Sequence, residues 1–142
     1  MAKLHCLTDY DPKILMAFGE SLKGKSRFTQ YFMDNNLPEL AALSAAIHSD
    51  EEALNWLLNN GFPEFAVLSN AIDGEPYAIA WLDRHHATIL SVFAAACRKD
   101  DQAILWMAQQ KMDLLLLLVR IIHDILKFQS WDSSDIHKRR RR

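Results

Sequence analysis

Glycine, proline and cysteine are scarce in this chain of 142 residues, which has four glycines, four prolines and two cysteines. Few residues therefore specialise in turns, and because Ala, Leu and Ile dominate over Val and Thr, we predict an all-α fold. Two cysteines exclude a disulfide framework, and no clustered Cys/His spacing indicates zinc. No apolar run is long enough to cross a bilayer and no signal peptide is recognisable, so we expect a cytoplasmic protein.

Positive charge is concentrated at the end of the chain. Residues 138–142 carry five positive charges, so a net charge of −2 for the whole chain leaves −7 for residues 1–137. Such a tail can contact nucleic acid or another anionic surface, or can solubilise the chain. No aromatic residues are interleaved with its basic ones, so nucleic acid is the weaker interpretation. The residues available for contact would be Arg139, Arg140, Arg141 and Arg142.

A column of aromatic residues indicates an internal repeat. Successive members lie 25 residues apart: Tyr31, Trp56, Trp81, Trp106 and Trp131. Leucine, alanine and turn residues keep the same step, so we predict a right-handed solenoid of five helix-turn-helix repeats. The repeats span about 12–36, 37–61, 62–86, 87–111 and 112–136, within a single domain of residues 1–137 followed by the basic tail. We expect the tryptophans to form a buried ladder in the core.

The second repeat shows how each unit folds. Pro38 suits the first position of a helix, Ser49 or Asp50 suits the N-cap of the next, and Asn60-Gly61 is typical of a left-handed helix end. Residues 43–61, LSAAIHSDEEALNWLLNNG, resemble the helix pair of an ankyrin repeat. The unit is shorter than the ankyrin length of about 33 residues and has no room for a β-hairpin. The resemblance extends over about residues 12–131 and implies a stack that binds proteins.

The string GESLKGKS, residues 19–26, matches the phosphate-loop pattern. Such a loop requires a strand before it, which KILMAF would have to supply. The repeat instead assigns KILMAF to a helix and places Lys25 and Ser26 in a polar turn. We therefore interpret the match as a coincidence, and a nucleotide-binding enzyme is the least favoured function.

The other reactive side chains have ordinary structural interpretations. His85 and His86 fall in a solvated turn between repeats, and Cys97 takes an isoleucine position, which predicts a buried hydrophobe rather than a nucleophile. We predict no catalytic, cofactor or metal site. The favoured function is a non-enzymatic protein–protein interaction module of unknown partner, and the alternative is an accessory protein that acts on nucleic acid or an anionic surface through the basic tail.

The fifth repeat is the most apolar. Terminal repeats usually present a polar outer face, yet MDLLLLLVRIIHDILKF, residues 112–128, is apolar around most of a helix. We expect its exposed half to be covered by the segment from Ser130 onward or by a second copy in a homodimer, which we favour. The residues expected at that contact are Leu114, Leu115, Leu118 and Ile122.

Overall fold

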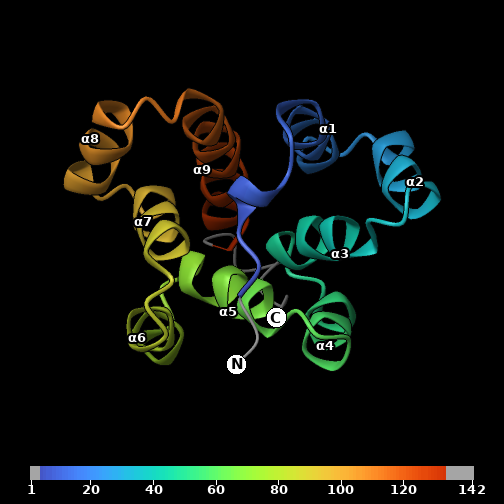
Figure 1. Cartoon of the computed structure of the whole chain (residues 1–142), viewed down its shortest axis with the longest axis horizontal. Helices are drawn as coiled ribbons and strands as arrows, with labels where there is room; N and C mark the ends of the chain where they lie inside the picture. Colours follow the sequence, from blue (N-terminus) through green and yellow to red (C-terminus); the bar gives the residue numbers. More distant parts are fainter. Residues whose placement is uncertain (1–3, 134–142) are drawn as a thin grey trace.

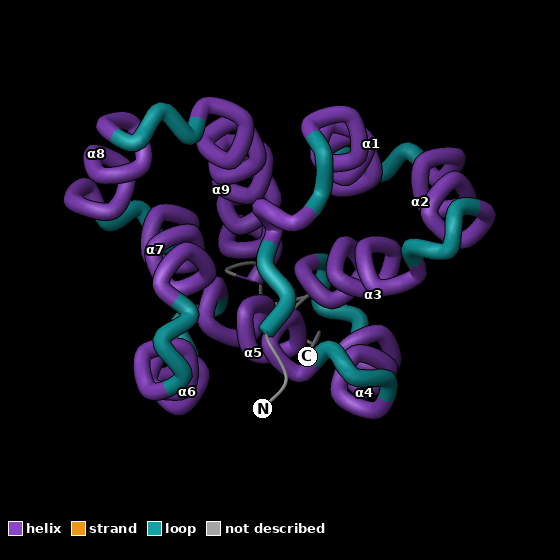
Figure 2. Tube along the Cα trace, viewed as in Figure 1, coloured by secondary structure: helices purple, strands orange, loops and turns teal. Residues whose placement is uncertain are grey.

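A computed structural model describes the backbone of residues 4–133. Within that range it contains nine α-helices, a short 3-10 helix at Leu7–Asp9 and no strand (Figure 2), so the all-helical prediction is confirmed. The helices are α1 (Pro12–Leu22), α2 (Ser26–Asp34), α3 (Pro38–Ile47), α4 (Glu51–Asn59), α5 (Pro63–Ile72), α6 (Pro76–Arg84), α7 (Thr88–Cys97), α8 (Asp101–Gln109) and α9 (Asp113–Ser133).

The odd-numbered helices form a closed inner ring, and the four even-numbered helices surround it (Figure 1). Each inner helix packs on the next, and α9 packs on α1. Each outer helix packs on the inner helices before and after it in the chain. In an open solenoid the repeats contact only their neighbours in sequence. The predicted right-handed solenoid is therefore not confirmed, because the first and last helices meet.

The core is built from equivalent positions of the inner helices. At one shared repeat position every inner helix carries a large side chain that is at most 1% exposed: Phe18, Leu43, Leu68, Phe93 and Leu118. Beside this column the residues are small, which lets the helices approach. A Cβ atom added at Gly19 would lie 3.2 Å from methyl groups of both Leu118 and Ile121. Glycine at this position therefore permits the close contact of α1 with α9.

The tryptophans are less buried than the sequence predicted. Trp56, Trp81 and Trp106 are half-buried and pack against the edge of the core, whereas the side chain of Trp131 lies outside the described residues. In each outer helix, the large residue one position later is wholly buried, at 0–1% exposure: Phe32, Leu57, Leu82 and Met107. The prediction that the tryptophans are buried in the core is therefore wrong. Successive side chains of a helix point about 100° apart, so when the following residue faces the core the tryptophan lies at its edge.

A residue in the left-handed conformation follows each of the first four inner helices. The φ angles are 93°, 74°, 86° and 70° at Gly24, Ser49, Gly74 and Lys99. At the last of these turns, the N–H of Lys99 donates to Ala96 O at 2.9 Å and the N–H of Asp100 to Ala95 O at 3.0 Å. This pattern is the Schellman motif, which satisfies carbonyls at a helix end and favours glycine. The Asp100 side chain then caps α8 by accepting from Gln102 and Ala103.

We expect Lys99→Gly to raise the free energy of unfolding by about 0.5–1 kcal/mol. Glycine removes a left-handed penalty of about 1–2 kcal/mol, and its greater freedom in the unfolded chain offsets part of that gain. Ala108→Gly, at an exposed position inside α8, should instead lower it by about 1 kcal/mol. Urea denaturation of both variants checks this prediction, and a loss of stability in Lys99→Gly would contradict it.

The fifth repeat is one continuous helix rather than a helix pair. The positions of the missing turn are Asp124 and Ile125, where the preceding repeat has Lys99 and the capping Asp100. Ile125 thus stands where the preceding repeat has its capping aspartate, and the backbone continues through it as α9. The extension reaches α3, where Gln129 Nε2 donates to Ile47 O at 3.4 Å.

The N-terminal segment lies against the beginnings of α3 and α5. Tyr10 Oη donates to Glu39 Oε2 at 2.8 Å, and the backbone N–H of His5 donates to the buried carboxylate of Glu64. Leu7 between them is wholly buried. Burial raises the pKa of the Tyr10 phenol above its ordinary value, and the hydrogen bond to Glu39 adds to this effect. The segment therefore satisfies two carboxylates that the ring itself leaves buried.

Candidate functional site

The residues of GESLKGKS do not form a phosphate loop. KILMAF lies inside α1, so a helix precedes Gly19, and Gly19 itself is packed against α9. Lys25 Nζ donates to Glu20 Oε1 at 2.6 Å. That bond and a second one from Lys23 hold the pKa of the Glu20 carboxyl below its ordinary value. A phosphate loop requires a strand before it and a cradle of free N–H groups. Here a helix takes the place of the strand, and the lysine is paired with Glu20.

The histidine pair and the buried cysteine lie as predicted. His85 is exposed in the turn after α6, where its ring stacks on Trp81 at 3.8 Å between centroids, and His86 takes a φ of 56°. Cys97 is 1% exposed, and burial raises the pKa of its thiol. Among the residues that the structure describes, no three His, Cys, Asp or Glu side chains are grouped to hold a metal ion. None of the described helices is long and apolar enough to span a membrane.

The apolar residues predicted as a contact surface of the fifth repeat belong mostly to the core. Leu115, Leu118 and Ile122 are at most 4% exposed, and Leu114 is half-buried. Helices α1, α7 and α8 pack against α9 and bury this side of it. The expected cover was the chain's end or a second copy, but the structure supplies it from the first helix. The four arginines Arg139, Arg140, Arg141 and Arg142 lie outside the described residues.

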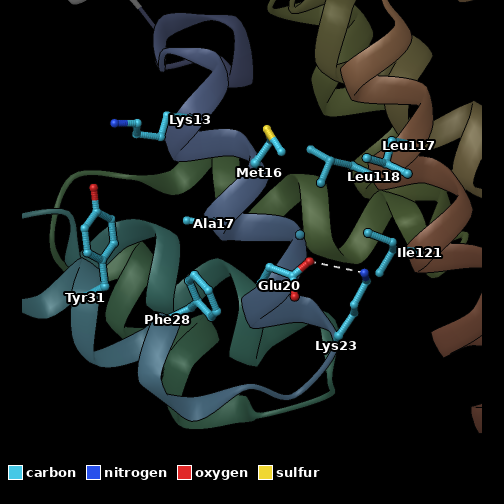
Figure 3. Close-up of a pocket in the computed structure, with 11 residues that line it drawn as sticks. Lys13, Met16, Ala17, Glu20, Lys23, Phe28, Tyr31, Leu117, Leu118 and Ile121 are labelled. Carbon is cyan, nitrogen blue, oxygen red and sulfur yellow. Dashed lines mark hydrogen bonds and ion pairs between the residues drawn. The ribbon is translucent and has the colours of Figure 1, made fainter.

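A groove remains open at the seam between α1 and α9, which we call the seam groove. It has a volume of about 430 Å³ and is lined by side chains of α1, α2 and α9 (Figure 3). Ala17 and Leu118 form its floor, since both are buried. Met16 and Leu117 project over it from opposite sides and are 58% and 46% exposed. The groove thus presents two exposed apolar side chains above an apolar floor.

The polar groups at the seam groove are engaged with one another. Glu20 pairs with Lys23 at 3.2 Å and with Lys25 at 2.6 Å. Lys13 stands at the other end of α1 (Figure 3). The remaining lining is apolar or aromatic, including Phe28 and Tyr31 from α2. This distribution suits an apolar surface of a partner better than a small polar molecule held by convergent hydrogen bonds.

The seam groove could not be predicted from the sequence, because a repeat pattern describes neighbouring units only. Ring closure places the first repeat beside the fifth. Comparing the sequences of successive repeats does not reveal that contact. One signal was present. The positions equivalent to Met16 are Ala41, Ala66, Ser91 and Leu116, so only the two repeats that meet at the seam carry a large apolar side chain there.

Comparisons of the chain with models of protein families, with curated proteins and with solved structures found no match. The class of protein therefore rests on the structure itself. It is an all-helical protein in which neighbouring helices pack, the last inner helix closes on the first, and an apolar groove lies at the closure.

Proposed function

We propose that the protein is a non-enzymatic protein–protein interaction module built on a helical-repeat scaffold, and that the seam groove binds its partner. The observation that carries the proposal is the exposure of Met16 and Leu117 over an apolar floor. Exposed apolar surface that gathers in one groove usually marks an interface, because its transfer out of water is favourable.

The repeat of 25 residues is part of the same proposal. In its support, α3, α5, α7 and α9 begin at residues 38, 63, 88 and 113, and α2, α4, α6 and α8 begin at residues 26, 51, 76 and 101. A scaffold of equal units holds its surface rigidly, since each unit is packed between two others. Action through the basic tail concerns residues 138–142, outside the described residues, and stays an alternative.

The proposal is tested by comparing the proteins captured from the source cell by three immobilised forms of the chain. These are the wild type, Leu117→Glu in the seam groove, and Leu105→Glu, which changes an exposed leucine of α8 elsewhere. A charge placed in an apolar contact should weaken binding about tenfold or more. We expect partners retained by the wild type and Leu105→Glu to be depleted with Leu117→Glu, as measured by quantitative mass spectrometry.

Circular dichroism melting of the three forms shows whether each is folded. If every captured protein is retained equally by the folded Leu117→Glu variant, the seam groove is not a protein-binding site.

A further inference from the structure

An outer helix covers every junction between neighbouring inner helices except one. Where α1 meets α3, α2 packs on both, and α4, α6 and α8 do the same at the next three junctions. Where α9 meets α1, no described helix packs on both (Figure 1). Side chains of α1 and α9 line the seam groove at this junction. The groove therefore occupies the position of a tenth helix.

The exposure of equivalent residues supports this assignment. Met16 is 58% exposed, whereas on inner helices flanked by two outer helices the equivalent Ala41 and Ala66 are 8% and 1% exposed and Ser91 is half-buried. On the other side of the seam, Leu117 is 46% exposed, whereas the equivalent Val67 is 7% exposed and Ala42 and Val92 are half-buried. Both sides of the seam thus carry the apolar surface that an outer helix covers elsewhere.

We infer that the seam groove accepts an amphipathic helix of a partner protein, packed as the tenth helix of the ring. This inference rests on the proposed function and names the chemistry of the partner. Outer helices α4, α6 and α8 share one pattern: alanine, an aliphatic residue, any residue, tryptophan, then leucine or methionine. The residues are Ala53-Leu54-Asn55-Trp56-Leu57, Ala78-Ile79-Ala80-Trp81-Leu82 and Ala103-Ile104-Leu105-Trp106-Met107. A partner helix with this pattern places its apolar residues on one face.

The end of this chain does not supply that helix. The residues equivalent to the pattern are Phe128, Gln129, Ser130, Trp131 and Asp132, so a carboxylate stands where other outer helices bury leucine or methionine at 0–1% exposure. Burying an unpaired carboxylate is costly. Gln129 is also engaged at Ile47 as part of α9. Residues 134–142 hold one aliphatic residue, Ile136, among polar and basic ones. The same objections apply to the end of a second copy.

Charge at the seam favours acidic residues in the first turn of the partner helix. In the second repeat, Asp50 and Glu51 at the start of α4 line a shared cavity with Asp73 at the end of α5. The residue of α1 equivalent to Asp73 is Lys23. A helix that enters the seam with the same orientation therefore brings its first turn to Lys23, which together with Lys25 pairs with the single carboxylate of Glu20, so the net charge there is positive. Acids at that place also favour the positive end of the helix dipole.

The chain itself provides the probe, a fluorescent peptide of residues 98–112, RKDDQAILWMAQQKM, which contains α8 and its acidic cap. Fluorescence anisotropy measures its binding to the full-length wild type, to Leu117→Glu, and to the control Leu105→Glu. Met16→Glu, on the other side of the groove, serves if Leu117→Glu does not fold. A second peptide carries Met107→Asp and reproduces the aspartate of the chain's own fifth repeat.

We expect saturable binding of the first peptide to the wild type and to Leu105→Glu. Binding should weaken at least about tenfold with a groove variant and with the Met107→Asp peptide. No binding to the wild type, or binding that is unchanged in both groove variants, overturns the inference. Self-association of the wild type in sedimentation equilibrium that is lost in Leu117→Glu overturns it as well, because a second copy is then the occupant.

The two proposals fail separately. If proteins captured from the cell depend on Leu117 while the peptide does not bind, the groove binds protein but not a helix of this pattern. If neither experiment depends on the groove, both proposals fall.

Discussion

Phe93→Ala should lower the free energy of unfolding by about 3–5 kcal/mol. Phe93 is 1% exposed and belongs to the column of large side chains that the five inner helices share. Removing the ring takes away its burial and leaves a cavity, and the neighbours cannot close that cavity because helices on both sides hold them. Chemical denaturation monitored by circular dichroism measures the loss.

Trp81→Ala is the matched comparison. The indole is larger than the phenyl ring, but it is half-buried and stacked on the exposed His85. Since much of its surface already faces water, the expected cost is about 2 kcal/mol. Equal costs, or a larger one for Trp81, would show that the tryptophan column rather than Phe93 and its equivalents is the main core.

Local features of the fold could be predicted because short-range chemistry determines them. Pro38 begins α3 and the Asp50 side chain caps α4 by accepting from the N–H groups of Glu52 and Ala53. Gly61 has a φ of 90°, as expected of a left-handed helix end. Each of these positions depends on residues within one turn, so the sequence contains the whole interaction.

Contacts between repeats were harder to predict, because one residue type can serve several purposes. His48 Nε2 donates to Leu22 O and His123 Nε2 donates to Ala96 O, both at 2.8 Å. At the equivalent position, Arg98 donates to Ala71 O at 2.7 Å. Each side chain satisfies a carbonyl near the end of the preceding inner helix. The 25-residue step makes His48 and His123 equivalent, but it does not reveal their partners, which are backbone atoms of another repeat.

Ring closure could not be predicted from the repeat, because the twist between units decides it. A small change of the angle per unit separates an open stack from a closed ring, and packing details set that angle. The lack of a polar outer face on the fifth repeat was the available sign. It was interpreted as a surface for the chain's end or a second copy, whereas Gly19 and its neighbours on α1 cover it.

The groove follows from closure combined with a missing turn. Ile125 replaces a capping residue, α9 continues, and the tenth position is left without a helix. Neither feature alone creates the groove. An open stack would expose the face of α9 that α1 covers, and a fifth helix pair would fill the seam.

Leu118→Ala should lower the free energy of unfolding by about 2–5 kcal/mol. Leu118 is wholly buried at the closure, and its side chain contacts the backbone position of Gly19. The adjacent Leu117 is 46% exposed, so Leu117→Ala should cost about 1 kcal/mol or less. The two variants change the same chemical group on the same helix, and they differ only in the side of α9 on which it lies.

Hydrogen exchange separates a closed ring from an open stack. In a closed ring, Leu118→Ala weakens the packing on α1, so the amides of residues 13–22 should exchange faster although they lie about a hundred residues earlier in the sequence. In an open stack, loosening the last helix spreads only to its neighbours and leaves the first unit protected. Unchanged exchange in α1, with faster exchange confined to α7, α8 and α9, would mean that the ring is open in solution and that the seam groove does not form.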